Sequence, residues 1–576
     1  MEIDVWLEKV VIEAALSSGC ENFSPEIRPS DPKFGDFQAN GALQYAKKYG
    51  QNPRTLAEKI ISHLSAKQEV KQNIEASLAG PGFINFKLRD EFLCQWLNEH
   101  FDANSFRPSV NSFLGKTVVV DYSSPNTAKQ MHVGHLRSMN IGESICRLLE
   151  FCGTKVIRDN HIGDWGTQFG ILIAMIKGEN IDLDKLPTDA ALAEIERLYK
   201  LGNSQIKKNE ACLSSARNEL VKLQNGDLEN IKIWEKINAI SYAAFDKIYS
   251  EFNVKFDYVL GESFYRDRVD AVCKSLEEYG IARSDNGALV VFFDEHGKFK
   301  DQPFLIRKSD GASNYATTDL ATVEYRKEHF HANEIIYVTD GRQQDHFQQL
   351  FMTVDKWFKA RNLASPNLHH VWFGTILGED GKAIKTRDGS PIYLQNLIIE
   401  ARKRAYQIVS EKNPDLGVEE KNEIASAVGI NAIRYFDLAQ NRTSDYMFSW
   451  ENMLSFDGNT AVYLLYAIAR MHSILGKIEE TDAPVNNLET KEERVLVRKL
   501  MYFPLVIKQA ISDLRPHYLC TYLYELAGEY SSFYNANRVL VNDVTVRNRR
   551  LILCKRTLLV LELGLNLLGM TTLKKM

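Results

Sequence analysis

Two histidines close together in the sequence are well placed for chemistry on a nucleotide. His132 and His135 flank Gly134 in the stretch DYSSPNTAKQMHVGHLRS, residues 121–138. Residues three apart share a face at the start of a helix, and a glycine between them leaves bare backbone on which a flat purine can lie. Imidazole donors, unpaired amides and the positive end of the helix dipole together favour a triphosphate. The stretch therefore predicts a nucleotide pocket.

Two other interpretations of these histidines are weaker. They could be ordinary polar residues at a helix start, but a His-x-Gly-His directly after a β-branched strand rarely arises by chance. They could instead bind zinc, but no nearby carboxylate or thiol has the spacing of a zinc ligand. We therefore expect no metal site and no structural zinc.

The segments around the histidines have the pattern of a parallel β-α-β unit. The β-branched run 116–121 predicts a strand, and apolar residues recur with helical spacing over 132–151. Gly153 ends that helix, and KVIRD begins a second strand. A further α/β segment is expected later, with strands at 303–308 and 334–340. The sequence thus predicts a doubly wound parallel sheet of the Rossmann-like class, which binds ligands at the carboxyl ends of its strands.

Changes in pattern along the chain predict several folded parts. Helical patterns and the alternating GFINFKL form an α+β unit at the amino terminus, and helical periodicity dominates the final part of the chain. A region rich in charge and helix resembles an insertion into the sheet. The expected bounds are 1–105 for the α+β domain, 113–395 for the α/β domain with its insertion at about 176–300, 396–455 for a helical linker and 456–576 for an all-α helical bundle.

The composition is that of an ordinary folded protein. Of its 576 residues, 44% are hydrophobic and 25% are charged, which argues against long disorder. The amino terminus lacks the basic-then-apolar order of a signal peptide, and no apolar run reaches the length of a membrane span. The eight cysteines form no Cys-x-x-Cys pair, so a reducing compartment, the cytoplasm, fits best.

The net charge of −5 is unevenly distributed. Residues 494–576 contain 13 Lys or Arg against 5 Asp or Glu. Within this region, rings and cations alternate from Tyr530 through Tyr534 to Arg538, and RNRR follows, as on surfaces that bind single-stranded RNA. A basic terminal region on an acidic body suggests contact with a polyanion.

These motifs also resemble those of a known family. HVGH resembles the ATP signature of class I aminoacyl-tRNA synthetases, and SSPNTAKQMHVGHLRS followed by NHIGDWGTQFG is similar to arginyl-tRNA synthetases in particular. The similarity continues through NYATTDLA, YVTDGRQQDHFQQL, FDGNTAVYLLYAIARMHSIL and the closing LNLLGMTTLKKM, and so covers nearly the whole chain.

The resemblance implies a reaction and its partners. It implies ATP-dependent attachment of L-arginine to its cognate tRNA(Arg) through an arginyl-adenylate, with release of AMP and pyrophosphate. The expected fold is a class I catalytic domain between an amino-terminal domain and a helical bundle. We expect Mg²⁺ to accompany the ATP substrate, and the enzyme to be a cytoplasmic monomer with no membrane partner. A requirement for bound tRNA during activation is a further hypothesis.

The resemblance assigns the ATP site to two segments. The family pattern Lys-Met-Ser-Lys-Ser is altered in GEDGKAIKTRDGSPIYL (378–394), where Thr386 stands at the second lysine position and Ala383 at the first. Many arginyl enzymes resemble this chain in lacking that lysine and carrying one three residues before the first histidine, here Lys129. An ammonium from either side stabilises charge on the leaving pyrophosphate. The expected catalytic residues are Lys129, His132 and His135, and the expected ATP contacts are Pro125, Lys129, His132, Gly134, His135, Lys382 and Lys385, with a solvated basic loop as the alternative for the last two.

Recognition of arginine requires carboxylates, because a planar guanidinium presents paired donors that bidentate acceptors satisfy. The resemblance identifies Asp121 and Asp319 as those acids and Tyr315 as their aromatic neighbour. Asn126 and Gln343 match residues that orient the α-amino and carboxylate groups. Helix capping is an alternative role for Asp319. We expect the two carboxylates to converge beside the triphosphate held by the histidines.

The resemblance also assigns tRNA contacts to both ends of the chain. The first domain, 1–105, matches a domain that binds the tRNA elbow, and the last, 456–576, matches the helical anticodon-binding domain. The expected contacts are Phe83 and Asn85 in the first and Tyr530, Tyr534 and Arg538 in the last.

Two other functions stay open at this point. A tRNA-independent nucleotidyltransferase shares the His-x-Gly-His loop, but such enzymes are usually shorter and lack a basic helical terminus. A non-catalytic RNA-binding or scaffold protein descended from a synthetase is favoured by Thr386, where the usual catalytic lysine is absent. Lys129 discriminates between these functions, because replacing it should abolish adenylate formation in an enzyme.

Overall fold

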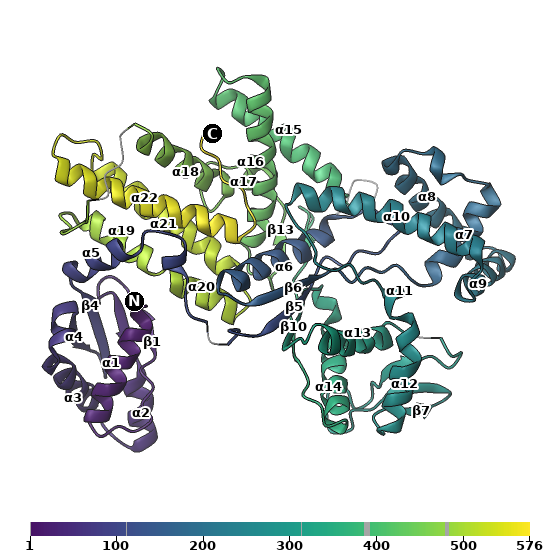
Figure 1. Ribbon diagram of the computed structural model, residues 1–576, viewed down its shortest axis with the longest axis horizontal. Helices are drawn as coiled ribbons and strands as arrows, with labels where there is room; N and C mark the ends of the chain where they lie inside the picture. Colours follow the sequence, from purple (N-terminus) through teal and green to yellow (C-terminus); the bar gives the residue numbers. More distant parts are fainter. Residues whose placement is uncertain (1, 111, 313, 385–391, 478–482) are drawn as a thin grey trace.

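The computed structural model describes residues 2–110, 112–312, 314–384, 392–477 and 483–576 (Figure 1). Its amino-terminal part contains α1 (Ile3–Ser17), β1 (Ile27–Pro29), β2 (Phe37–Ala39), α2 (Gly41–Tyr49), α3 (Pro53–Ala66), α4 (Gln68–Asn73), β3 (Ile74–Ala79), β4 (Phe83–Leu88) and α5 (Asp90–Glu99). The four strands form an antiparallel sheet in the order β1-β2-β4-β3. The alternation in β4 puts Ile84, Phe86 and Leu88 into the core, as a half-buried strand requires. Asn52 caps α3, and Pro53 occupies its first turn.

The central part is a parallel sheet whose strand order confirms the doubly wound class. Across the sheet the strands are β11 (Asn367–His370), β10 (Glu334–Tyr337), β5 (Thr117–Asp121) and β6 (Lys155–Asp159). The chain leaves β5 through α6 (Val133–Phe151) to β6 on one side, and later returns to β10 on the other. At the carboxyl ends, Asp121 is opposite both Asp159 and Tyr337. The strand order reverses between β5 and β10, and such a switch point is where these sheets bind ligands.

The strand expected at 303–308 exists but does not join this sheet. β9 (Phe304–Arg307) pairs antiparallel with β8 (Ala288–Val291), which pairs antiparallel with β7 (Arg283–Asp285). Its assignment to the parallel sheet was wrong, because an apolar run indicates a buried strand without specifying the strand beside it. The helix that follows, α13 (Tyr315–His329), does lead into β10, and α14 (Gln344–Ala360) then leads to β11.

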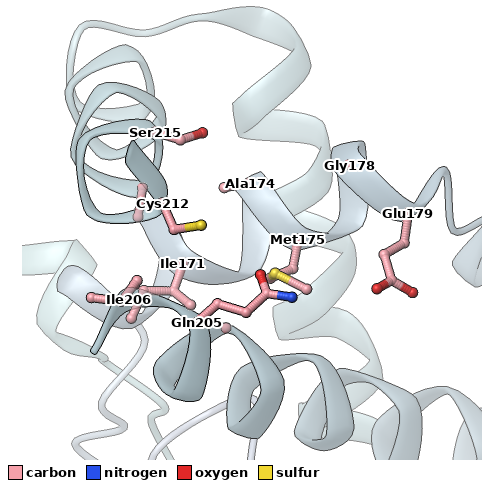
Figure 2. A pocket seen from close by; sticks show the side chains of 11 residues that line it. Ile171, Ala174, Met175, Gly178, Glu179, Gln205, Ile206, Cys212 and Ser215 are labelled. Atoms are coloured by element: carbon pink, nitrogen blue, oxygen red, sulfur yellow. The ribbon is translucent and has the colours of Figure 1, made fainter. Parts of the chain in front are cut away.

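Helices fill most of the chain between β6 and β7. They are α7 (Thr167–Glu179), η2 (Leu183–Lys185), α8 (Thr188–Ile206), α9 (Glu210–Gln224), α10 (Leu228–Glu251), α11 (Glu262–Tyr265), η3 (Arg266–Arg268) and α12 (Val269–Glu278). An added Cβ at Gly170 would collide with the Ala216 carbonyl, so α7 and α9 pack closely. Beside this contact, α7, α8 and α9 border a cavity of about 300 Å³ that is lined by apolar side chains such as Ile171 and by Cys212 (Figure 2).

The carboxyl-terminal part is helical, as the periodicity predicts. Its elements are α15 (Leu394–Lys412), α16 (Val418–Leu438), α17 (Trp450–Met453), α18 (Ala461–Leu475), α19 (Lys491–Met501), α20 (Phe503–Ser512), α21 (His517–Ala536) and α22 (Val544–Leu567). A short parallel pair, β12 (Ile376–Leu377) and β13 (Tyr446–Met447), links this part to the sheet region. Within the described ranges, no helix is both long and apolar enough to cross a membrane.

Candidate active site

The two histidines form a reciprocal cap at the start of α6. His132 is the N-cap residue, and its Nδ1 accepts a hydrogen bond from the backbone N–H of Gly134 at 3.0 Å. His135 Nδ1 accepts in turn from the backbone N–H of His132 at 3.1 Å. The centroids of the two rings are 4.1 Å apart. Both histidines therefore lie together at a helix start that follows a strand, as the sequence indicates.

These hydrogen bonds determine which ring nitrogen carries the proton. Because Nδ1 accepts in both rings, each neutral imidazole carries its proton on Nε2. Burial, followed by the influence of His132 and Lys129, lowers the pKa of His135 to about 3. Burial, and then the charges of Lys129 and Arg342, also lower the pKa of His132. Near pH 7 each ring thus offers an Nε2–H donor rather than a positive charge.

The loop between β5 and α6 is held against the segment that follows β6. Asn126 forms a parallel bridge with Gly163, and the Gly163 N–H donates to the Pro125 carbonyl at 3.1 Å. An added Cβ at Gly163 would collide with the Asn126 side chain, so this close approach requires glycine. Ser124 and Ala128 have positive φ angles of 45° and 66°. The result is a fixed loop in which Pro125 is buried and Asn126 is exposed.

Lys129 is exposed and lies within electrostatic reach of both histidines. Its Nζ is 5.3 Å from the ring centroid of Tyr199. Its charge contributes to the lowered pKa of His132 and of His135. The ammonium that the resemblance assigns to the leaving pyrophosphate therefore lies within electrostatic reach of both imidazoles.

The segment expected to complete the ATP site ends beside this turn. Lys382 is exposed. Lys385 lies outside the described residues. Near the end of the segment, Tyr393 forms an antiparallel bridge with His132. The end of the second segment is thus hydrogen-bonded to the histidine turn.

Asp121 lies at the switch point, where a cation of the chain itself already neutralises it. Its Oδ2 accepts a hydrogen bond from Arg326 Nη2 at 2.7 Å, and its Oδ1 accepts from the Ser124 hydroxyl at 2.9 Å. Arg326 is buried and also donates to Asp159 Oδ2 at 2.8 Å. The expectation that Asp121 contacts the guanidinium of arginine stays a prediction, and the structure adds that Arg326 already pairs with this carboxylate. The sequence could not indicate the pairing, because Arg326 is distant along the chain.

Asp319 approaches the same region from α13. Its Oδ2 is 2.6 Å from His346 Nε2. Tyr315, one helical turn earlier, is 62% exposed, and its ring centroid is 4.9 Å from that of His346. Burial raises the pKa of Tyr337, and both Asp121 and Asp319 add to this shift. The two carboxylates therefore lie within electrostatic reach of one tyrosine at the carboxyl end of β10.

Glu262, at the start of α11, is a further carboxylate in this region that sequence reasoning missed. Burial raises the pKa of Glu262 to about 7, with Asp319 and Asp164 adding to the shift and His161 opposing it. Near neutral pH this group is close to half ionised, so a neighbouring cation would favour its charged form. No spacing in the sequence connects Glu262 with Asp319, because tertiary packing brings them together.

The turn after β10 contributes an exposed amide and an exposed cation. Gln343 ends the short turn η4 (Gly341–Gln343) and is exposed. Arg342 makes two hydrogen bonds to Asp340, at 2.7 and 2.8 Å, while 87% of its side chain is exposed. Its charge helps to lower the pKa of the first signature histidine. Arg342 adjoins Gln343 in the motif GRQQDH, and sequence reasoning overlooked it.

Two of the residues expected to contact tRNA are buried. Asn85 is 4% exposed and accepts a hydrogen bond from Gln38 Nε2 at 2.7 Å. Tyr530 is 2% exposed, and its hydroxyl lies 3.6 Å from Cys554 Sγ. Neither side chain is available to stack on a base, so both are corrected to packing residues. Alternation of rings and cations does not reveal which rings face the core of a bundle.

The other expected tRNA contacts are more accessible. Phe83 and Tyr534 are half-buried, and Arg538 is exposed. The Arg470 guanidinium lies 4.2 Å from the ring centroid of Tyr534. Arg470 also lines a hollow of about 620 Å³ beside the carboxyl terminus, together with Tyr466, Lys574 and Lys575. Rings and cations around a hollow suit a base and its phosphate.

The basic motif RNRR is partly neutralised within the protein. Arg549 Nε and Arg550 Nε each lie 3.1 Å from a carboxylate oxygen of Glu493, which is fully buried. These ion pairs hold α22 against α19. The positive charge of this stretch is therefore less available to RNA than its composition suggests.

Three family models match successive parts of the chain. The Arginyl tRNA synthetase N terminal domain matches residues 6–88, the tRNA synthetases class I (R) catalytic domain matches 104–450, and the DALR anticodon binding domain matches 464–576. The chain is 40% identical to an arginine--tRNA ligase of Actinobacillus succinogenes, with all of both chains covered. The chain belongs to the arginyl-tRNA synthetase family. The resemblance carried by HVGH and the motifs after it is confirmed.

Other members of the arginyl-tRNA synthetase family resemble this chain in sequence or structure over nearly its whole length. An arginine--tRNA ligase of Fusobacterium nucleatum is 42% identical over 96% of this chain and 97% of the relative. The structure matches the arginyl-tRNA synthetase of Plasmodium falciparum with a TM-score of 0.84 and 30% identity, over 100% of this chain and 99% of the other. It matches that of Thermus thermophilus with a TM-score of 0.83 and 25% identity, over 100% of both.

Proposed function

We propose that this arginine--tRNA ligase joins L-arginine to tRNA(Arg) in two steps at the switch point between β5 and β10. First, a carboxylate oxygen of arginine attacks the α-phosphorus of ATP, and the bond from that phosphorus to pyrophosphate breaks. Then a terminal ribose hydroxyl of tRNA attacks the carbonyl carbon of arginyl-adenylate, AMP leaves, and the hydroxyl proton passes to solvent. The observations that carry this proposal are the histidine cap at the start of α6, the helix that follows β5, and the carboxylate of Asp121 at the carboxyl end of that strand.

The donors around the cap suit the phosphates of ATP. His132 and His135 each offer an Nε2–H, and the amino end of α6 adds its positive dipole. Lys129 and Arg342 supply positive charge within reach of the first histidine, where charge builds on the leaving pyrophosphate. Donors fixed in place before the reaction stabilise such developing charge. Gly134, which is exposed, leaves room for the purine, and we retain Pro125 and Lys382 as further contacts.

The carboxylates suit the guanidinium of arginine. We assign the guanidinium to Asp319 and Glu262, because both are acidic groups at the site without an arginine partner in the described chain. Asp121 acts through its pair with Arg326, which fixes the wall of the pocket at the ends of β5 and β6. The residues proposed to contact the rest of the arginine molecule are Asn126, Tyr315 and Gln343.

Magnesium is proposed to reach the site on the ATP substrate. No group of three or more His, Cys, Asp or Glu side chains in the described ranges could hold a metal ion. Mg²⁺ usually binds through substrate phosphates and few protein carboxylates.

The tRNA is proposed to contact the enzyme at both ends of the chain. Residues 1–105 would bind its elbow and residues 456–576 its anticodon, on either side of the catalytic region 113–395 and the linker 396–455. We also propose a cytoplasmic monomer, because a single chain matches all three family models and seven of its eight free cysteines are buried. Such thiols suit a reducing compartment.

A single assay tests the function. The purified chain is incubated with ATP, total tRNA and each of the twenty amino acids in turn, and aminoacyl-tRNA and AMP are measured. We expect arginine alone to give charged tRNA, with one AMP for each arginine attached. Charging with another amino acid, or AMP formation without tRNA charging, would overturn the proposal.

A further inference from the structure

Two arginines fasten the helix that carries the signature histidines to two distant parts of the chain. Arg434 on α16 is buried, and its Nε donates to Asn140 Oδ1 on α6 at 3.3 Å. Its Nη2 donates to the Phe252 carbonyl at 2.6 Å, and its Nη1 donates to the Gly569 carbonyl. One guanidinium therefore contacts α6, the end of α10 and the end of α22.

Arg147 on α6 makes a similar set of contacts. Its Nη2 donates to the Asn253 carbonyl at 3.1 Å, and its Nη1 donates to the Asn566 carbonyl at 3.4 Å. Its Nε is held by Glu143 on the same helix at 2.6 Å. Both arginines thus bind backbone carbonyls at the same two helix ends.

The location of these carbonyls explains how the buried cation of Arg434 is tolerated. α10 and α22 are 24 residues long, and Phe252 is the C-cap residue of α10. The last carbonyls of a helix lack partners within it and carry the negative end of its dipole. Burial lowers the pKa of Arg434 to about 10, with Glu143 opposing that shift. The two helix ends provide the acceptors that a buried guanidinium needs.

The three helices belong to different functional parts. α22 lies in the region matched by the anticodon-binding model, and α10 belongs to the helical region between β6 and β7. α6 begins at the His132 cap. In Figure 1, α22 reaches the centre from the left and α10 from the right, with α6 between their inner ends. After α22, Asn431 Nδ2 donates to the Thr571 carbonyl at 2.7 Å, which ties the terminal segment to α16.

We infer that Arg434 and Arg147 are positioning residues that couple RNA bound on the anticodon helices to the ATP pocket at the amino end of α6. This inference rests on the proposed function. A displacement of α22 by RNA moves the carbonyls that these guanidinium groups hold, and α6 moves with them. Replacing either arginine by a neutral side chain uncouples the anticodon from the chemistry while leaving the ATP and arginine pockets unaltered.

The test compares two arginine tRNA transcripts, one native and one with its anticodon replaced. The turnover number for charging is measured with the wild type, Arg147→Gln, Arg147→Lys and Arg434→Gln. Arg361→Gln is the matched control, because Arg361 pairs with Glu324 within the catalytic part and its side chain is 19% exposed, the same fraction as that of Arg147. Thermal unfolding shows which variants are folded.

In the wild type we expect the anticodon change to lower turnover by about tenfold or more. In Arg147→Gln and Arg434→Gln the two transcripts should differ by less than about twofold, with the native transcript reduced to the rate of the altered one. Arg147→Lys should retain part of the difference, and Arg361→Gln all of it. If Arg434→Gln does not fold, Arg147→Gln carries the test.

A folded Arg147→Gln enzyme that keeps the wild-type ratio would overturn the inference, even if its overall stability is lower. A wild-type turnover number that does not depend on the anticodon would also overturn it, while charging with arginine left the proposed function intact. Failure of the wild type to charge tRNA with arginine would instead remove the function itself.

Discussion

His135 accepts a hydrogen bond at Nδ1 from the backbone N–H of His132, 3.1 Å away. This bond closes the first turn of α6, and because Nδ1 accepts, it leaves the proton of the neutral His135 ring on Nε2. Capping interactions of this kind contribute about 1 kcal/mol to helix stability. The ring atoms that stabilise the helix therefore belong to the residues proposed to bind ATP, and substitutions of these histidines should affect both folding and catalysis.

Replacing His135 with Asn should flatten the loss of stability in acid. The pKa of His135 is about 3 in the folded protein, whereas an unfolded histidine titrates near about 6.5. As the pH falls, the unfolded chain binds the proton first, so the contribution of His135 is complete above about pH 6.5 and is lost progressively toward about pH 3. Asparagine offers an acceptor oxygen that does not titrate. Urea unfolding between about pH 8 and pH 5 measures the difference, and equal pH slopes in both proteins would contradict this account.

Replacing Lys129 with Ala should lower the rate of adenylate formation by about 10²–10³-fold, because the charge on the leaving pyrophosphate loses its ammonium partner. Arginine binding should change little. Pyrophosphate exchange in the presence of tRNA measures the rate, and calorimetry measures arginine binding. Lys200→Ala is the control, since Lys200 is paired with Glu196 at 2.8 Å on the surface of α8. A fully active Lys129→Ala enzyme would remove the proposed substitute for the lysine missing at Thr386.

Arginine affinity should depend on the ionisation of Glu262. The pKa of Glu262 is about 7 in the free protein, and a bound guanidinium favours the ionised form. Affinity should therefore rise by about tenfold per pH unit up to about pH 7 and level off above it, with a proton released on binding below that pH. Calorimetry in buffers of different ionisation enthalpy counts the proton. Glu262→Gln should bind arginine more weakly and lose this dependence, and an unchanged pH profile in that variant would exclude Glu262 from the site.

Substitutions of Arg326 and Asp319 should affect different properties, the first the stability of the fold and the second the binding of arginine. Arg326→Met leaves Asp121 and Asp159 as neighbouring buried carboxylates, so we expect the free energy of unfolding to fall by about 3–5 kcal/mol. Asp319→Asn removes a carboxylate that we propose contacts the guanidinium, so we expect arginine binding to weaken by about 2–5 kcal/mol with a smaller effect on unfolding. Denaturant unfolding and calorimetry on both variants measure the two quantities. The assignment fails if Asp319→Asn binds arginine as tightly as the wild type.

Substitutions of Tyr530 and Arg538 should also have separate effects, with Tyr530 affecting the stability of the fold and Arg538 affecting tRNA binding. Tyr530→Phe removes a buried hydroxyl and Tyr530→Ala a buried ring, so the second should lower the free energy of unfolding by about 3–5 kcal/mol. Arg538→Ala should leave stability unchanged and weaken tRNA binding, with a shallower dependence on salt. Filter binding at several salt concentrations measures this. Loss of tRNA affinity in a folded Tyr530→Phe enzyme would show that the hydroxyl contacts RNA after all.

The sequence by itself determined the features that depend on neighbouring residues. The β-branched run before Asp121 gave β5, the helical spacing after His132 gave α6, and the position of the histidines at the junction placed them at a helix start. Strand formation, helix periodicity and capping are local, so residues within one or two turns decide them. The motifs and their order along the chain also identify the family.

Only the tertiary structure decided which charges and rings meet. Arg326 pairs with Asp121, Glu262 lies within electrostatic reach of Asp319, and Tyr530 is buried in the core. The spacing of these residues in the sequence predicts none of these contacts. The pairing of β9 outside the parallel sheet has the same origin. The partner of a buried charge or strand is selected by packing between segments far apart in sequence, and its energy depends on burial that exists only after the chain has folded.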